Sequence, residues 1–167
     1  MFEEPGKLVN GTLNWAAARR GDPNGSLIVV SFDLAEEVFD EVPQPDYGIG
    51  NYKLFVGVLK DCLCMICDRG GNCVDVWMMK EYGVKESWSK LVSMPYMPEM
   101  MPIDFSRSLC FLKYGGILMY FGNILVLYDL NEKTFKYPML NDVRGCHEAD
   151  VYLETLVSPN AYNGIGR

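Results

Sequence analysis

The stretch that decides the fold is Val74-Asp75-Val76-Trp77-Met78-Met79-Lys80-Glu81-Tyr82-Gly83-Val84-Lys85-Glu86-Ser87-Trp88-Ser89-Lys90-Leu91. Its first part has the period-two pattern of a strand with two packed faces. One face carries Val74, Val76 and Met78, and the other carries Asp75, Trp77 and Met79. A charged turn follows, and a second strand resumes at Trp88. We expect the two tryptophans to pack across neighbouring strands of an all-β domain.

Two other segments follow the same plan of four short strands separated by turns. Strands are expected at 8–9, 12–15, 27–34 and 39–43 in the first unit, at 54–59, 62–67 and within 74–91 in the second, and at 109–112, 117–121, 124–130 and 135–138 in the third. The strongest hairpin signal is Asn10-Gly11, because both residues tolerate the positive φ of a type I′ turn.

Three sets of apolar residues, which we call markers, recur at corresponding positions in the three units. They are Leu13, Leu63 and Leu118 in the second strand, Phe32, Trp77 and Tyr128 late in the third, and Phe39, Trp88 and Phe135 at the start of the fourth. Their spacing of roughly 45–55 residues is the period of kelch-like propeller blades. The phrase Asp-Leu also recurs, at Asp33 and Asp129, each time with an aromatic six residues after the aspartate.

The predicted fold is therefore all-β, with antiparallel four-stranded kelch-like blades forming a partial β-propeller of about three blades plus one strand at 150–157. We expect one domain over 1–160 and a flexible tail over 161–167. Because propellers have four to eight blades, we interpret the chain as the C-terminal part of a longer domain. An open stack that dimerises to cover its faces is the less favoured alternative.

Composition and charge exclude several functions. The net charge of −7 and the pI of about 4.7 oppose binding to nucleic acid or anionic membranes. The sequence has no run of 18 apolar residues, so no membrane-spanning helix is predicted. The N-terminus lacks the pattern of a signal peptide, and six cysteines in such a chain indicate free thiols in a reducing compartment. We expect a cytoplasmic or nuclear protein.

The cysteines are the first candidates for chemistry. Cys62, Cys64, Cys67 and Cys73 are close enough in sequence to suggest a zinc site or a redox pair. However, Cys64 and Cys67 lie within an apolar strand, where a spacing of three residues places the side chains on opposite faces. We therefore favour packing as small buried hydrophobes, with no metal and no cofactor.

The other candidates are also interpreted as structural. His147 is the single histidine, beside Cys146 and Glu148 in a polar loop, and one histidine cannot build a catalytic or multi-histidine metal site. The paired acids are Glu3-Glu4, Glu36-Glu37 and Asp40-Glu41, which are typical of solvated strand edges. Gly70-Gly71 and Gly115-Gly116 are turns. No catalytic or cofactor-binding residue is assigned, and we expect that the protein is not an enzyme.

Methionines, prolines and a tyrosine alternate over 94–102. Such adaptable contact residues on an extended backbone are typical of a partner-binding loop, but the position between two units favours a linker.

The phrases of this sequence resemble the F-box-associated interaction domain of plant F-box proteins. The central phrase over 76–90 is similar to the family's W-x-M-K-E-Y-G-V-x-x-S-W-x-K, and residues 9–15 resemble V-N-G-x-L-H-W, with Asn14 where histidine is common. Residues 31–39 resemble S-F-D-L-x-x-E-x-F, and 128–130 and 156–159 match later strands. The likeness covers nearly the whole chain.

The resemblance implies the recognition of a target protein for a Skp–cullin–F-box ubiquitin ligase. In that family an F-box motif docks on the Skp adaptor, and the associated domain captures the target. No F-box precedes Val9, so Skp and cullin are expected as partners only through an F-box not present in this sequence. The target-binding residues are unknown, because the family shares no fixed ones. The alternatives are a zinc- or thiol-dependent protein using the four cysteines, or a truncated fragment without function.

Overall fold

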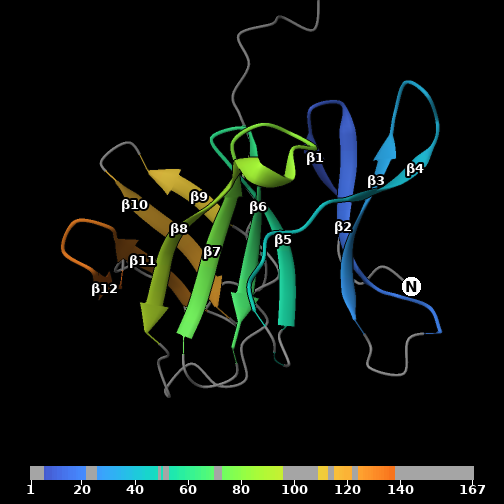
Figure 1. The fold of residues 1–167 in the computed structure, drawn as a ribbon. Helices are drawn as coiled ribbons and strands as arrows, with labels where there is room; N and C mark the ends of the chain where they lie inside the picture. The colour runs from blue at the N-terminus through green and yellow to red at the C-terminus, as the bar shows by residue number, and fades with distance from the viewer. Residues whose placement is uncertain are drawn as a thin grey trace, which may run out of the picture.

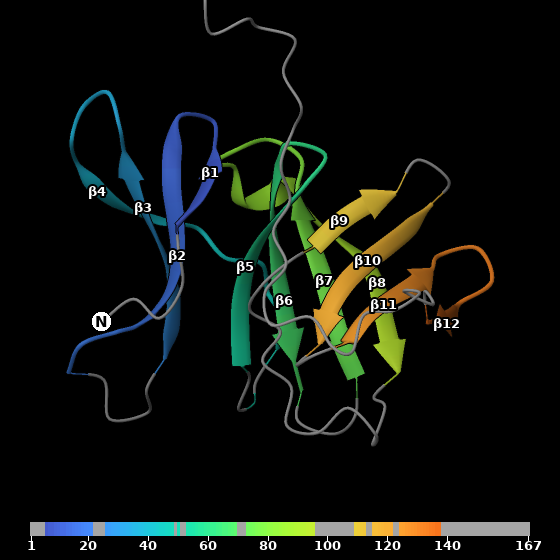
Figure 2. The same ribbon diagram turned by 180° about the vertical axis from the view of Figure 1, so that it is seen from behind.

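The computed structural model describes residues 6–21, 26–48, 50, 53–69, 73–95, 109–112, 115–121 and 124–137. These residues form three four-stranded antiparallel sheets, in each of which the spatial order of the strands follows the chain. The three sheets stand side by side as successive layers, with the second between the other two (Figure 1). The view from behind shows the third sheet against the second (Figure 2). The predicted all-β, partial propeller fold is confirmed.

The sheets are called blades 1, 2 and 3. Blade 1 contains β1 (Lys7–Val9), β2 (Thr12–Ala18), β3 (Leu27–Asp33) and β4 (Phe39–Val42). Blade 2 contains β5 (Lys53–Leu59), β6 (Cys62–Asp68), β7 (Cys73–Met79) and β8 (Trp88–Pro95), with the short 3-10 turn η1 (Lys85–Ser87) before β8. Blade 3 contains β9 (Leu109–Leu112), β10 (Gly116–Phe121), β11 (Ile124–Asp129) and β12 (Thr134–Lys136). The predicted strand at 150–157 and the predicted tail lie outside the described residues.

The first hairpin of blade 1 and that of blade 2 use the same turn. Asn10 and Gly11 have φ values of 50° and 77°, and Lys60 and Asp61 have values of 50° and 60°. Positive φ at both central residues is the type I′ geometry, whose twist matches that of the flanking strands. The turn predicted from Asn10-Gly11 is thus confirmed, and the turn at Lys60-Asp61 adopts the same shape without a glycine.

The repeated Asp-Leu phrase builds the β3–β4 turn of blade 1 and the β11–β12 turn of blade 3. Asp33 Oδ1 accepts hydrogen bonds from the backbone N–H groups of the second and third residues after it, at 2.8 and 3.0 Å. Asp129 Oδ1 does the same at 2.9 and 3.0 Å. These donors lower the pKa of Asp33, while Lys136 together with such donors lowers that of Asp129 to about 2. An aspartate that satisfies turn N–H groups explains the recurring phrase.

Strand pairing corrects two of the three sets of markers. Phe39 pairs with Phe32, at 4.7 Å between ring centroids, and Trp88 pairs with Met79. Met79, not Trp77, therefore corresponds to Phe32. The loop 80–87 leaves β7 after Met79, so Met79 and Trp88 form the pair nearest the loop, and the irregularity of register between Val76 and Trp77 lies further along the strands.

The same register contradicts the expected packing of two tryptophans across the strands. Trp77 pairs with Lys90, whose Nζ lies 5.2 Å from the indole ring centroid, a cation–π arrangement. In blade 3 the marker is also displaced by one residue, since Ile117 and not Leu118 pairs with Tyr128. The periodicity predicted the described strands, and its markers are correct partners in blade 1 and for Tyr128 with Phe135, but not for Trp77 and Leu118.

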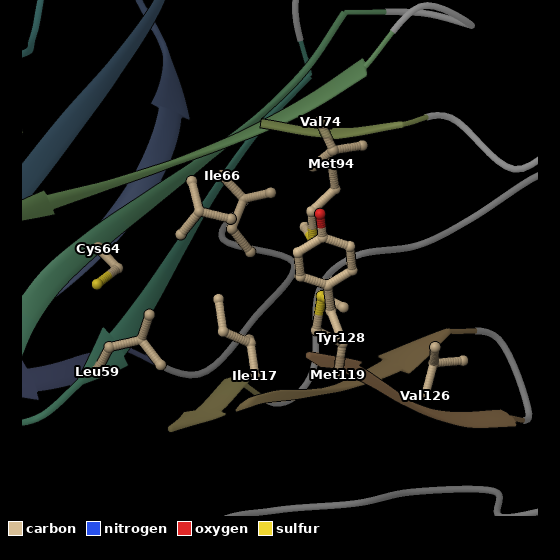
Figure 3. Packing of buried hydrophobic residues seen from close by; sticks show 10 residues of the cluster. Leu59, Cys64, Ile66, Val74, Met94, Ile117, Met119, Val126 and Tyr128 are labelled. Atoms are coloured by element: carbon tan, nitrogen blue, oxygen red, sulfur yellow. The ribbon is translucent and has the colours of Figure 1, made fainter. Parts of the chain in front are cut away.

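Two apolar cores join the three blades. The core between blades 1 and 2 contains Val9, Val29, Val42, Leu54, Val56, Leu63, Met65, Cys67, Met79 and Trp88. The core between blades 2 and 3 contains Leu59, Cys64, Ile66, Val74, Val76, Met94, Ile117, Met119, Val126 and Tyr128. In Figure 3 the Tyr128 ring reaches from blade 3 toward Met94 and Val74 of blade 2.

Each blade therefore has a front face, directed toward the preceding blade, and a rear face, directed toward the following one. Met79 packs in the first core, whereas Val74 and Val76 pack in the second. The two faces predicted for this strand are confirmed. Blade 2 is consequently buried on both sides, as a central blade of a propeller must be.

Candidate functional site

The loops at one end of blades 1 and 2 form an exposed polar surface. We call this surface the loop end, comprising the turns at 10–11, 34–38, 60–61 and 80–87 (Figure 1). Its exposed charged residues are Glu36, Glu37, Lys60, Asp61, Lys80, Glu81, Lys85 and Glu86. Both signs of charge are interspersed, which is suitable for polar contacts with a protein surface.

The 80–87 loop is held by its own hydrogen bonds. The Ser87 hydroxyl lies 2.8 Å from the Glu81 carbonyl oxygen and 2.7 Å from that of Val84, and it accepts a bond from Glu81 N–H at 3.1 Å. Gly83 has a φ of 80° and donates its N–H to the sulfur of Met79 at 3.1 Å. The loop thus presents its charges from a fixed backbone, which reduces the entropy that binding costs.

Tyr82 ties this loop to blade 1. Its hydroxyl donates to Asn14 Oδ1 at 2.8 Å and lies 2.7 Å from Thr12 Oγ1. Asn14 is fully buried, and its amide nitrogen donates to the Lys7 carbonyl oxygen at 3.1 Å. A buried amide needs such partners on both its oxygen and its nitrogen. The Tyr82 bond therefore fixes the 80–87 loop relative to the turn at 10–11.

A second tie involves Trp88, at the start of β8. The indole is 8% exposed within the first core, and its Nε1–H donates to the Pro43 carbonyl oxygen at 2.7 Å. Pro43 begins the connection from β4 to β5. Tyr82 and Trp88, two of the three large aromatics in residues 74–91, thus both join blade 2 to blade 1.

A buried carboxylate provides the third tie. Asp75, on β7, is 1% exposed. It accepts from Arg69 Nε at 3.0 Å, Lys90 Nζ at 2.9 Å and Ser93 Oγ at 2.6 Å. Arg69 also donates to the Tyr47 carbonyl oxygen at 2.8 Å, in the connection between blades 1 and 2. The charge network therefore holds that connection against blade 2.

The Asp75 network can stabilise the fold, but Asp75 is not suited to act as a general base. Burial by itself raises the pKa of Asp75, but the hydrogen bonds from Ser93 and Lys90 and the charges of Lys90 and Arg69 outweigh it, and the pKa lies below its ordinary value. A general base near neutral pH needs a raised carboxylate pKa. Our sequence reasoning did not single out Asp75, although a lone acid among buried valines is a signal for a paired charge.

The structure separates the cysteines that were considered as a zinc site. Cys64 packs in the core between blades 2 and 3, and Cys67 packs in the core between blades 1 and 2. Burial raises the pKa of each thiol to about 12, so both are protonated and unreactive at neutral pH. Within the described part of the chain, no group of three or more His, Cys, Asp or Glu side chains is placed to hold a metal.

The paired acids that the structure describes are solvated, as predicted. Glu36, Glu37, Asp40 and Glu41 are all exposed, and Glu41 forms an exposed ion pair with Arg19 at 2.6 Å. The other candidates lie outside the described residues; they are Glu3-Glu4, Gly70-Gly71, Cys146, His147, Glu148 and the segment 96–102. Among the residues that the structure describes, no helix is long and apolar enough to cross a membrane.

Comparisons with known proteins agree on one family. The profile of the F-box associated beta propeller domain matches residues 2–152. An F-box/kelch-repeat protein of Arabidopsis thaliana is 40% identical over 156 residues, which cover 93% of this chain and 41% of that protein. The Arabidopsis F-box protein CPR1 is 32% identical over 157 residues, covering 91% of this chain and 38% of its own. The chain spans about two fifths of the length of the curated relatives it matches.

Proposed function

The chain belongs to the F-box-associated β-propeller family, and we propose that it is a protein-interaction module that captures a target protein for a Skp–cullin–F-box ubiquitin ligase. The observation that carries the proposal is the pair of ties made by Tyr82 and Trp88. They fix the loop end of two blades as one surface with exposed charges of both signs. A rigid scaffold that presents loops is the usual arrangement of a binding surface.

We propose a division of labour between this domain and the F-box. Contact with the Skp adaptor, and through it with a cullin, requires the F-box motif, which is a separate helical element. The described residues contain strands, turns and one 3-10 turn. This chain would therefore supply target recognition, and adaptor recruitment would depend on F-box sequence in the same polypeptide.

The proposal is tested by comparing the proteins that the chain enriches from a plant extract. One variant reverses four charges of the loop end: Glu36→Lys, Glu37→Lys, Lys85→Glu and Glu86→Lys. The control variant reverses one exposed charge at the opposite end of blade 2, Lys53→Glu. Enriched proteins are identified by quantitative mass spectrometry and then titrated as purified proteins against all three chains.

We expect the wild-type chain and the control to enrich the same target, and the loop-end variant to lose it. Reversal of charges at a binding rim mainly lowers the association rate and changes its salt dependence. Equal enrichment by all three chains would place target binding elsewhere on the molecule. Absence of any saturable partner for the wild-type chain would contradict the function itself.

A further inference from the structure

The β3–β4 turn of blade 1 and the β11–β12 turn of blade 3 are two copies of one structure. Both project from their sheets (Figure 1). In both, the fourth residue after the aspartate donates its backbone N–H to the aspartate carbonyl oxygen, at 3.0 Å from Glu37 to Asp33 and at 2.8 Å from Lys133 to Asp129. Glu37 and Lys133 also share a positive φ, of 56° and 55°. The two turns therefore correspond residue by residue.

The two turns differ in charge. In blade 3, Lys136 Nζ lies 2.9 Å from Asp129 Oδ2 and 2.8 Å from Glu132 Oε2. This turn also contains Lys133, so its acids are balanced by cations. The corresponding positions of blade 1 are all acidic; they are Asp33, Glu36, Glu37 and Asp40. Acids thus stand where blade 3 has its two lysines.

We call residues 33–40 the acidic turn. Among the residues that the structure describes, no lysine or arginine forms an ion pair with its four carboxylates. The next acid along the chain, Glu41, is by contrast paired with Arg19 at 2.6 Å. Like charges held close together repel one another, and a bound cation relieves this repulsion. The acidic turn therefore carries negative charge that its own blade does not compensate.

The exposure of this turn does not depend on which blades flank it. The exposed residues are Glu36, Glu37, Val38 and Asp40. The corresponding residues of blade 3 are also exposed; they are Glu132, Lys133, Thr134 and Lys136. Blade 3 packs behind blade 2, so a preceding blade leaves these positions in solvent. The same positions of blade 1 are exposed because they belong to the projecting part of the turn.

Val38 gives the acidic turn an apolar contact. Its side chain is 53% exposed, and it follows Glu37 directly in the chain. The alkyl stems of lysine and arginine pack along apolar surface while their charged ends stay in water. A valine beside uncompensated carboxylates therefore suits a basic side chain, whose stem contacts the valine and whose charge meets an acid. Blade 3 has the more polar Thr134 at this position.

From the unpaired acids and the exposed valine we propose that the acidic turn binds a segment of the target protein that carries closely spaced lysines or arginines. This inference rests on the proposed function, because the turn is part of the loop end, and it adds the charge of the segment that the target presents. An acidic segment is disfavoured by like-charge repulsion. The net charge of −7 raises the association rate of a basic segment.

The test uses the whole chain to select peptides from a random library displayed on phage. We expect the selected peptides to be enriched in lysine and arginine. The peptide that binds most tightly is synthesised and titrated at several salt concentrations. Glu37→Lys should raise its dissociation constant about tenfold and weaken its dependence on salt. Lys133 has the same positive φ, so a lysine is compatible with the backbone at this position.

Asp46→Lys is the matched control. Asp46 is an exposed acid in the connection that follows β4, outside the acidic turn and outside the loop end. Its substitution changes the net charge by the same amount as Glu37→Lys. We expect it to change the dissociation constant less than about twofold, because screening by salt confines the strong interactions to nearby charges.

A larger effect is expected when the turn of blade 1 receives the residues of blade 3. The variant combines Glu37→Lys, Val38→Thr and Asp40→Lys. It should raise the dissociation constant about 100-fold, because the turn then contains as many cations as acids. Circular dichroism checks that the variant is folded. If it is not, a second variant removes charge at nearly constant shape; it combines Glu36→Gln, Glu37→Gln and Asp40→Asn.

Three results would overturn the inference. The first is a set of selected peptides without enrichment in lysine and arginine. The second is an equal loss of affinity in Glu37→Lys and Asp46→Lys, since binding would then follow net charge alone. The third is a target from the plant extract that the loop-end variant loses but the blade 3 residues in the acidic turn leave bound. This third result keeps the proposed function and excludes the acidic turn as the contact.

Discussion

Phe39 in blade 1 and Trp88 in blade 2 start corresponding strands and occupy the same register position, yet Phe39 is 64% exposed and Trp88 is 8% exposed. The difference comes from the neighbour and not from the residue. Trp88 is covered by blade 1, whereas the described residues provide no such cover for Phe39. The apolar residues of a blade therefore form a face that can pack against another blade. Whether this face is buried or exposed depends on the presence of that neighbouring blade.

A second difference between the two blades concerns the turn that precedes these residues. In blade 1 the carboxylate of Asp33 closes a short local turn. Blade 2 has the longer loop of 80–87, whose Tyr82 bonds to Asn14 of the neighbouring blade. The local turn stabilises its own sheet, while the longer loop stabilises a junction between sheets.

The largest expected effect is the loss of Trp88. Trp88→Ala should lower the free energy of unfolding by about 3–5 kcal/mol, since it leaves a cavity in the first core and an unpaired carbonyl on Pro43. Phe39→Ala is the matched change in blade 1, and it should cost less than about 1 kcal/mol because the ring is 64% exposed. Urea unfolding followed by fluorescence of the remaining tryptophans measures both. Equal costs for the two changes would contradict the comparison.

The second-largest expected loss of stability follows removal of the buried carboxylate of Asp75. Asp75→Ala should lower the free energy of unfolding by about 2–3 kcal/mol, because Arg69 and Lys90 lose their shared acceptor and the connection at Tyr47 loses its support. The cost stays below that of a fully buried pair, since the Arg69 and Lys90 side chains are 31% and 40% exposed and can be hydrated. Thermal unfolding of the variant beside Arg19→Ala, which disrupts an exposed pair, separates this junction from surface charge in general.

The contribution of Asp75 should depend on pH. Its pKa is lower in the folded chain than the ordinary 3.8, so the folded state favours the ionised form. This stabilisation is fully present above pH 3.8 and is lost as the pH falls through the folded pKa. The difference in unfolding free energy between wild type and Asp75→Asn should therefore be constant from pH 7 to about pH 5 and shrink at lower pH. A difference that stays constant down to the acid transition would mean that Asp75 is not held as a carboxylate.

The smallest effect expected at the junction of blades 1 and 2 is that of Tyr82→Phe, about 1 kcal/mol. The change removes the hydroxyl that donates to the buried Asn14 and leaves the rest of the ring. It should also increase amide hydrogen exchange in the 80–87 loop more than in the turn at 34–38, because only the former is tied to the other blade. Unchanged exchange in both loops would show that the loop is held by its internal Ser87 bonds alone.

Local features of the fold were predictable from the sequence. Asn10-Gly11 and the Asp33 phrase fix their turns through their own backbone preferences, so the strands around them followed correctly. Cys64 and Cys67 were assigned to opposite faces from their spacing alone, and they lie in different cores.

Features that depend on distant residues were not predictable in the same way. The bond of Tyr82 to Asn14 joins residues 68 positions apart, and no local pattern indicates it. Trp77 lies two residues before Met79, the partner of Trp88, and the irregularity beside it places Lys90 opposite the indole, which the periodic pattern of the strand does not indicate. The partners of Asp75 come from the neighbouring strand β8 and from the residue that follows β6, so its role required the assembled blade.

Hydroxyl-radical footprinting of the unmodified chain, with each residue's rate normalised to that in the unfolded chain, directly tests whether a preceding blade decides the burial of a front face. We expect Phe39 to react at nearly its unfolded rate and Trp88 and Tyr128 to be strongly protected, because only the latter two are covered by a preceding blade. Protection of Phe39 equal to that of Trp88 in the monomer would contradict the claim that the front face of blade 1 is left open.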